Sequence, residues 1–363
     1  MRLRLARAGL ETRLRQAIFS TSGALGIHRL FAFLNRNQPI VLTFHGVTAT
    51  PPRNICNYEG IHLDLSVFAR LMGHLASHYQ TVSLARVVDW LEGRSAAPER
   101  AVVVTFDDGF RNVLTTAAPV LQRLNIPATL FVTTDFVFEG KMLWPDRLLS
   151  ALALTGEARV EVEWANESHV FELGDDTRRI EASRALLALC KSLPQAERLA
   201  LLERVIDRLG VEESRLRGAW DDQRPLDPSE LKKLPEAGIE VGSHTCSHPI
   251  VSRLEPREVK RELEESKRRI EAAVGRPCLD FAYPNGAPGD FNPQTHREVM
   301  EAGYRSAVTT IKRRVGRADR CFEIPRCTLT HNQITMDEFA SEVSGFPGAL
   351  RAVRRRIGSG RAA

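Results

Sequence analysis

Seven short apolar segments alternate with amphipathic helical segments, and this alternation constrains the fold more than any other feature of the chain. The segments are rich in β-branched and aromatic residues, as buried strands are. They cover residues 40–45, 101–106, 128–133, 239–242, 279–283, 305–309 and 324–329. Alternating strands and helices predict an α/β fold with a parallel sheet. Seven such strands favour an incomplete or irregular barrel over an open sheet.

One segment breaks the alternation. Residues 140–225 begin with KMLWPDRLLSALAL, pass through a hairpin-like stretch (EVEW and HVFEL), and end in helices predicted over 178–193 and 196–209. We interpret the segment as a mainly helical insertion or cap within a barrel domain that spans residues 39–346. Two helices of the barrel itself are predicted over 65–77 and 256–274.

Basic charge is concentrated at the two ends of this 363-residue chain. Residues 1–36 hold seven arginines and one acid, residues 346–363 hold five arginines and no acid, and the part between is net acidic. Apolar residues near helical spacing predict that residues 1–38 form a basic amphipathic helix, which either lies on anionic lipid or packs on the domain. Residues 347–363 form a basic tail. No nucleic-acid recognition motif is present, so we expect no nucleic-acid partner.

The sequence also bears on location. No run of 18 uncharged apolar residues occurs, so no transmembrane helix is expected. Charges up to Arg15 interrupt any signal-peptide core. The six cysteines are scattered without a C-x-x-C pair, which favours reduced thiols over a disulfide framework. We therefore expect a cytoplasmic protein, with peripheral attachment to the inner membrane face as a further possibility.

The strongest local pattern is VVVTFDDG, residues 102–109. An apolar strand ends in two adjacent carboxylates, Asp107 and Asp108, and side chains on a strand alternate between its faces. Gly109 permits a sharp turn that lets both carboxylates reach one pocket. In parallel α/β folds, ligands bind at this end of the strands. The alternative interpretation is a plain Asp-Asp-Gly turn.

A second pattern, SHTCSHP, follows the predicted strand 239–242. If Ser243 caps a single helical turn, His244 and His248 point the same way and can present ring nitrogens to one ion. Such histidine pairs bind divalent metals when a carboxylate completes the set. Cys246 would lie on the opposite side of the turn. Two histidines satisfied within the core are the alternative.

Two looser patterns follow further along the chain. In FAYPNG, residues 281–286, proline and glycine would hold a loop whose backbone N–H groups could face an oxyanion. In LTH, His331 comes directly after the last predicted strand and could act as a general acid. A histidine on the surface or in the core is the alternative for His331.

Taken in order, TFDDG, SHTCSHP, FAYPNG and LTH resemble the motifs of the NodB-homology polysaccharide deacetylases, carbohydrate esterase family 4. The resemblance covers roughly residues 40–346 except the insertion. It implies a distorted (β/α)7 barrel related to the TIM barrel, and removal of acyl groups, usually acetyl, with one divalent metal. The FAYPNG form is similar to the branch that includes poly-N-acetylglucosamine deacetylases.

The resemblance also implies roles for individual residues. Asp108, His244 and His248 would hold the metal, and Asp107 would be the base that deprotonates the attacking water. The backbone N–H of Tyr283 would assist the oxyanion, while His331 would protonate the departing amine. Zinc is favoured as the metal, with cobalt, nickel and iron open because these ligands do not discriminate among them.

Two departures from the family pattern affect the base. Many members carry an arginine where this chain has Ala282, and the usual Asp-Trp motif is absent. We expect Arg326 to replace that arginine as the partner of Asp107, with a structural salt bridge as the alternative.

Three further residues are candidates for supporting roles. His45 follows the first predicted strand and would contact substrate or support the metal shell. Asn285 lies in the FAYPNG loop. Trp144, in LWPDR, would stack on a sugar ring or anchor the cap.

The favoured function is metal-dependent removal of an acetyl group from the amide nitrogen of an N-acetylated amino sugar, in polysaccharide or glycolipid biosynthesis. The sugar could be nucleotide-linked, lipid-linked or polymeric. One alternative is deformylation or deacetylation of a small non-sugar amide. Others are a non-catalytic sugar-binding subunit and a lipid-docked adaptor. The complete motif set favours an enzyme, because a binding-only descendant would be expected to have lost part of it.

Overall fold

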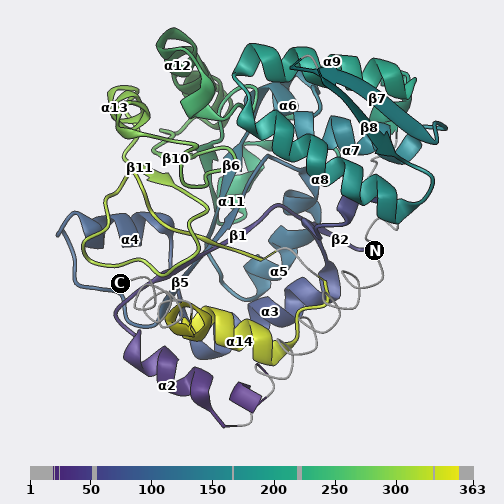
Figure 1. The fold of residues 1–363 in the computed structure, drawn as a ribbon. Coiled ribbons are helices and arrows are strands. Elements are labelled where there is room, and N and C mark those ends of the chain that lie inside the picture. The colour runs from purple at the N-terminus through teal and green to yellow at the C-terminus, as the bar shows by residue number, and fades with distance from the viewer. Residues whose placement is uncertain are drawn as a thin grey trace, which may run out of the picture.

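A computed structural model of the chain describes residues 19, 21–23, 25–50, 55–165, 167–218, 223–329 and 332–350 (Figure 1). Its centre is an eight-stranded sheet in which every pairing is parallel. Seven strands follow one another in the order β11-β10-β9-β6-β5-β1-β12, and the eighth, β4, pairs with β5. The strands are β1 (Ile40–Phe44), β4 (Gln80–Thr81), β5 (Ala101–Phe106), β6 (Ala128–Val132), β9 (Ile239–Ser243), β10 (Asp280–Ala282), β11 (Ser306–Val308) and β12 (Cys327–Thr328).

The two edges of this sheet approach each other. A parallel bridge joins Val308 of β11 to Ile324, and Ile324 lies just before β12, which pairs with β1. The sheet therefore curves into a distorted barrel, and the predicted α/β barrel is confirmed. Each of the seven predicted strand segments contains an observed strand, although β12 is only two residues long.

Helices surround the barrel. They are α2 (Ile27–Leu34), α3 (Leu65–His78), α4 (Leu84–Leu91), α5 (Ala118–Arg123), α6 (Thr134–Glu139), α11 (Lys233–Glu236), α12 (Pro256–Val274), α13 (Pro293–Glu301) and α14 (Met336–Ser344). The longest, α12, begins at a capping box formed by Glu255 and Glu258, and it ends at Gly275 with a φ of 72°. Among the described helices, none is both long and apolar enough to cross a bilayer.

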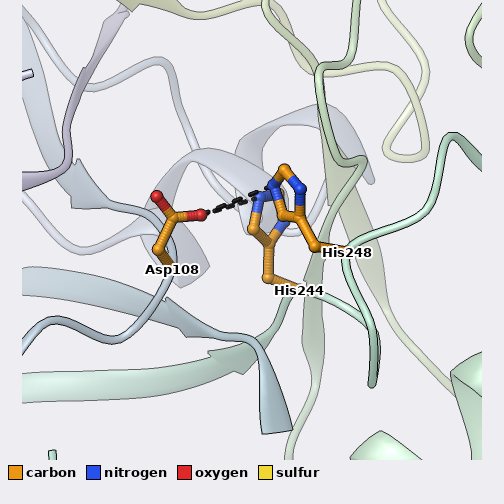
Figure 2. Close-up of side chains that lie close together, drawn as sticks. All are labelled: Asp108, His244 and His248. Atoms are coloured by element: carbon orange, nitrogen blue, oxygen red, sulfur yellow. Dashed lines mark ion pairs between the residues drawn. The ribbon is translucent and has the colours of Figure 1, made fainter. Parts of the chain in front are cut away.

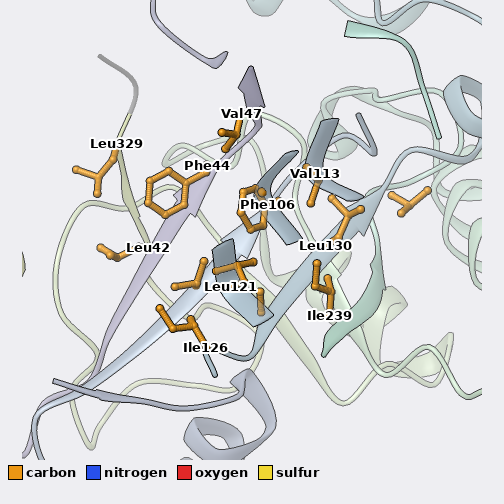
Figure 3. Close-up of a cluster of buried hydrophobic side chains, with 14 of the residues drawn as sticks. Leu42, Phe44, Val47, Phe106, Val113, Leu121, Ile126, Leu130, Ile239 and Leu329 are labelled. Carbon is orange, nitrogen blue, oxygen red and sulfur yellow. The ribbon is translucent and has the colours of Figure 1, made fainter. Parts of the chain in front are cut away.

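Both faces of the central strands are buried, as expected for a parallel sheet covered by helices. On β1, Leu42 and Phe44 pack outward in the largest apolar cluster with Phe106 and Leu130 (Figure 3). Val41, the residue before Leu42, belongs to a separate cluster on the other face. This double burial explains why the strands appear in the sequence as continuous apolar segments.

The insertion forms a compact unit beside the barrel (Figure 1). It contains α7 (Trp144–Leu154), the antiparallel hairpin β7 (Arg159–Trp164) and β8 (Glu167–Glu172), α8 (Asp176–Ser192), α9 (Gln195–Leu209) and α10 (Glu213–Gly218). Its apolar side chains form a separate cluster, which Ile55 from outside the insertion joins. The hairpin and both long helices were predicted to within a few residues.

Several short elements have no clear pattern in the sequence. They are the parallel pair β2 (Gly46–Thr48) and β3 (His62–Asp64), a π-helical turn η2 (Val113–Ala117), and three 3-10 turns, η1 (Ile55–Asn57), η4 (Pro228–Glu230) and η5 (Val251–Arg253).

Candidate active site

The carboxylates of Asp107 and Asp108 leave the end of β5 in different directions. Asp107 continues the strand's alternation on the face of Val103 and Thr105. Asp108 and Gly109 then take positive φ values of 78° and 104°, which turn the chain sharply. A glycine is needed at the second position, because a side chain there would be strained at this φ and would lie 3.0 Å from Val137. The turn lets both carboxylates reach the same end of the barrel.

Asp107 is held by a buried arginine. The guanidinium of Arg326 donates to both carboxylate oxygens, with Nη1–Oδ1 2.7 Å and Nη2–Oδ2 2.8 Å. Arg326 also donates to Thr309 O and Thr105 Oγ1 and is fully buried. Burial alone would raise the pKa of Asp107, but Arg326 and, to a smaller extent, His244 hold it at about 2. The contact expected between Arg326 and Asp107 is therefore present.

Asp108 lies opposite the two histidines that follow β9 (Figure 2). Asp108 Oδ1 is 3.7 Å from His244 Nε2 and 3.5 Å from His248 Nε2, and the imidazole centroids are 4.8 Å apart. These three side chains are the cluster of possible metal-ligating groups found among the described residues. Ligand atoms that hold an ion at about 2.0–2.2 Å lie roughly 3–3.5 Å from one another, so the spacing suits a divalent ion.

The hydrogen bonding of these residues and the neutral state of the two histidines also fit a metal. Burial and the neighbouring Asp107 raise the pKa of Asp108, and a bound cation would act against that shift. His244 Nδ1 donates to Ala282 O at 2.7 Å, which leaves the Nε2 lone pair facing Asp108. Burial lowers the pKa of His244 to about 4 and that of His248 well below its usual range, so both rings are neutral, as ligands must be. Asp108 Oδ1 is buried and accepts no hydrogen bond from the described residues. A cation would satisfy that oxygen.

The loop that carries the histidines differs from the expected helical turn. Residues 244–248 form an irregular loop in which Thr245 and His248 have positive φ values of 69° and 57°. The side chain of Glu262, buried on α12, accepts from the backbone N–H groups of Cys246 (2.7 Å) and Ser247 (2.9 Å). The turn was wrongly predicted because a carboxylate from a distant helix, rather than local helix bonds, pairs this backbone.

Cys246 lies against α12, away from the metal-ligating cluster. Its Sγ is 3.7 Å from Glu262 O, and burial raises the pKa of the thiol to about 12. A buried neutral thiol of this kind is a poor ligand. The sequence places it between two histidines, but the fold does not bring it to them.

Comparison with known proteins identifies the fold around these residues. A protein-family model described as polysaccharide deacetylase matches residues 94–168 and 203–307, which include Asp107, Asp108 and both histidines. The chain belongs to the polysaccharide deacetylase family. The gap between the two matched ranges falls inside the insertion.

Individual deacetylases match less of the chain. Poly-β-1,6-N-acetyl-D-glucosamine N-deacetylase of Escherichia coli (strain K12) is 44% identical over 50 residues, which are 14% of this chain and 7% of that protein. The chain aligns with less than a third of the length of the curated relatives it matches.

Solved structures support the fold over most of the chain. The Streptococcus pyogenes deacetylase PplD, solved in complex with acetate, superposes with a TM-score of 0.56 at 15% identity, covering 84% of this chain and 98% of that one. IcaB from Ammonifex degensii gives a TM-score of 0.52 at 18% identity, covering 85% and 96%. At these identities the likeness concerns the deacetylase fold alone.

A pocket of about 290 Å³ opens over the metal-ligating cluster. The barrel side contributes Asp107, Asp108, the two histidines, His45 and Tyr283, and the insertion contributes Trp144, Asp146, Leu149, Leu187 and Lys191. His45 therefore lies where it was expected, at the mouth of the barrel, and burial lowers its pKa. The deacetylase pocket is thus built by two parts of the chain.

Trp144 connects these two parts. Its indole Nε1 donates to His248 O at 3.2 Å, and the guanidinium of Arg198 lies 4.8 Å from the ring centroid. The ring is only 7% exposed. This geometry favours an anchor for the cap over a platform for a sugar ring.

One expectation for the FAYPNG loop needs correction. The backbone N–H of Tyr283 donates to Val308 O at 3.1 Å, continuing the pairing of β10 with β11, so it is not a free donor to an oxyanion. Asn285 lines the pocket, where a supporting role stays a prediction, and its side-chain amide donates to Asp290, which fixes the loop internally. His331, the expected general acid, lies outside the described residues.

Sequence reasoning missed Glu262 and Asp146. Glu262 shares the buried face of α12 with Val259, Leu263 and Ser266. An acidic residue on the buried face of a predicted helix is the signal in the sequence that could have revealed it. Asp146 lies in the first turn of α7, where burial raises the pKa of its carboxyl to about 7. The family motifs do not include either residue.

Proposed function

We propose that this deacetylase is a divalent-metal-dependent hydrolase that removes the acetyl group from the amide nitrogen of an N-acetylated amino sugar during polysaccharide or glycolipid biosynthesis. The observation that carries the proposal is that Asp108, His244 and His248 lie close together in one pocket. The carboxylate of Asp107, which Arg326 holds ionised, lines the same pocket. The family is generally metal-dependent, and the nitrogen and carboxylate donors suit zinc best, with cobalt, nickel or iron as alternatives.

Each residue has a distinct task in this proposal. Asp108, His244 and His248 would hold the ion, which when bound makes water more acidic and polarises an amide carbonyl. Asp107 takes the proton from the attacking water, and its paired contacts with Arg326 fix the orientation of the carboxylate. Water adds to the acyl carbon, the carbon–nitrogen bond breaks, and the departing amine takes a proton, for which we assign His331.

The test of this function is acetate release. Purified full-length protein is expected to contain about one divalent ion per chain and to release acetate from at least one class of N-acetyl sugar, whether polymeric, lipid-linked or nucleotide-linked. Chelation should abolish the activity, and adding back the ion should restore it. Metal analysis and an enzymatic acetate assay provide the two readouts.

Other outcomes favour the alternatives. Formate release, or acetate release from small non-sugar amides only, would point to a deformylase or a general amide deacetylase. Sugar binding without any release of acid would point to a non-catalytic subunit and would overturn the proposal.

We further propose that the protein is cytoplasmic and acts at the inner face of an anionic membrane, through the surface around α2. Leu30, Phe33 and Leu34 are between 56% and 60% exposed, which is unusual for neighbouring large apolar residues. Arg29 and Arg36 lie on the same short segment. Apolar side chains flanked by arginines suit the interface of a bilayer with acidic headgroups. The expected basic helix before residue 19 and the basic tail after residue 350 lie outside the described residues.

This surface can be tested with vesicles. Phe33→Ser combined with Leu34→Ser is expected to lower sedimentation with phosphatidylglycerol vesicles at least about tenfold, because each buried apolar side chain contributes roughly 1.5–3 kcal/mol. Val170→Ser, which removes an exposed apolar residue from β8, is the matched control and should change nothing. Equal sedimentation of the double variant and the original protein would reject the membrane proposal.

A further inference from the structure

The loop that carries both histidines has a backbone that needs support from outside. In this histidine loop, residues 244–248, Thr245 and His248 have φ values of 69° and 57°. A positive φ is unfavourable for residues that carry a side chain, and it persists only where the surrounding structure fixes it. The loop belongs to neither a helix nor a strand, so regular backbone bonds do not supply that support.

The start of α6 holds carbonyl groups of the histidine loop. The backbone N–H of Thr134 donates to Thr245 O at 3.1 Å, and that of Asp135 donates to Cys246 O at 2.9 Å. These contacts use the carbonyl side of the loop only. Because buried backbone N–H groups also need partners, the centre of the loop has to be paired from a second direction.

Glu262 of α12 provides this second support. Its Oε2 accepts from the backbone N–H groups of Cys246 and Ser247 at 2.7 and 2.9 Å, and its Oε1 accepts from Ser247 Oγ at 2.8 Å. Glu262 is 3% exposed. Arg261 lies 3.7 Å from Oε1, but its side chain is 69% exposed, so the loop is the closer partner. Burying a carboxylate is unfavourable unless it is hydrogen-bonded, and the three contacts with the loop meet that requirement.

The contact lies between the two proposed histidine ligands. The residues that Glu262 pairs stand between His244 and His248 in the chain, and the two imidazole centroids are 4.8 Å apart. Their Nε2 atoms lie 3.7 and 3.5 Å from Asp108 Oδ1 (Figure 2). Without Glu262, two backbone N–H groups would lose their acceptor, and the backbone between the ligands would have to rearrange to pair them again.

We propose that Glu262 is a positioning residue for the metal site, which fixes the backbone between His244 and His248 and thereby raises the affinity of the site for its ion. Glu262 does not line the catalytic pocket, so it acts through the histidine loop. The inference rests on the proposed metal-dependent function. It assigns part of the affinity for the ion to α12, a helix that carries none of the proposed ligands.

The experiment measures the dissociation constant for zinc, by competition with a chromogenic chelator, on the full-length protein. Glu262→Leu removes all three acceptor contacts, while a side chain of similar size still fills the buried face of α12. The zinc dissociation constant of this variant is expected to rise about 10- to 100-fold, the usual effect of removing a residue that orients metal ligands.

Glu262→Gln separates the position of this side chain from its charge. The amide oxygen can accept from both backbone N–H groups, and the amide nitrogen can donate to Ser247 Oγ. This variant is therefore expected to bind zinc within about threefold of the original protein. If the negative charge of Glu262 attracted the cation directly, Glu262→Gln would lose as much affinity as Glu262→Leu, and that result would reject the positioning role.

Glu230→Leu is the matched control. Glu230 is also buried, its oxygens accept from the guanidinium of Arg111 at distances between 2.8 and 3.0 Å, and it does not line the catalytic pocket. Its replacement is expected to lower the free energy of unfolding but to leave the zinc dissociation constant within about twofold, since the two sites share no partners. An equal loss of zinc affinity in both leucine variants would contradict the inference, because general destabilisation would then explain it.

Loss of folding can be separated from loss of positioning. If Glu262→Leu does not fold, Glu262→Asp keeps a carboxylate that is one methylene too short to reach the loop, and its zinc dissociation constant should rise at least about threefold. A folded variant at this position, Leu or Asp, that binds zinc as tightly as the original protein would overturn the inference and leave the proposed function intact. If the original protein itself binds no divalent ion, the metal-dependent function fails, and the inference fails with it.

Discussion

Replacing Asp107 by asparagine is expected to lower the rate of acetate release by about 10²- to 10⁴-fold, while one divalent ion per chain is retained. The carboxylate that accepts the proton is lost, but Asp108, His244 and His248, the proposed ligands, are unchanged. Asp108→Asn is expected to lose both the ion and the activity, since it removes a proposed metal ligand. Metal analysis and the acetate assay, applied to both variants, measure the difference.

A control is needed because Asp107→Asn leaves the buried Arg326 without its counter-charge. Asp280→Asn removes another buried carboxylate, which lies at the start of β10 and does not line the pocket over the metal-ligating cluster. It accepts a hydrogen bond from Ser306 of β11. That variant should keep both the ion and the turnover. A fully active Asp107→Asn protein would show that Asp107 is not the base, and loss of the ion from that variant would assign Asp107 to the metal instead.

The largest expected change in stability follows from Arg326→Met. Removing one partner of a buried ion pair typically costs about 3–5 kcal/mol, because the remaining charge has no counter-charge and cannot reach water. Arg326 and Asp107 are both almost completely buried. Urea denaturation should therefore show a large fall in the free energy of unfolding. Arg313→Met, which removes an ion pair with Asp319 from a half-exposed arginine, should cost no more than about 1 kcal/mol.

The double variant Asp107→Asn with Arg326→Met completes a thermodynamic cycle. It should be more stable than Arg326→Met alone, because no unpaired charge remains in the barrel. If the effects of the two substitutions on the free energy of unfolding simply add, the two groups do not interact, and the pairing at 2.7–2.8 Å contributes nothing to stability.

The strand pattern made much of this site predictable. The register of β1 with β5 pairs Phe44 with Phe106, and that of β6 with β9 pairs Val132 with Ser243. Motifs that directly follow these strands must then meet at one edge of the sheet. The alternation of strand and helix segments in the sequence was sufficient for this, because it predicts parallel strands, whose carboxyl ends lie at one edge of the sheet.

Other features depend on contacts between segments that are distant in sequence. Glu262 pairs the backbone of the histidine loop from 16 residues away, and Arg326 reaches Asp107 across 219 residues. Because Glu262 pairs this backbone, residues 244–248 form an irregular loop where local spacing had suggested a helical turn. The backbone N–H of Tyr283 was misassigned although Tyr283 falls within the predicted strand 279–283, since its use by Val308 follows from strand pairing that continues one residue past the observed end of β10.

The indole of Trp144 connects the insertion with the proposed metal site as well as with the pocket. Its hydrogen bond to His248 O attaches α7 to the backbone of a proposed ligand. A sugar chain that shifts α7 would alter the placement of that imidazole. If the sugar thereby changes the affinity for the ion, thermodynamic linkage requires the ion to change the affinity for the sugar by the same factor. A barrel engineered with a short linker in place of residues 140–225 should therefore bind its ion more weakly, even though every ligand is still present.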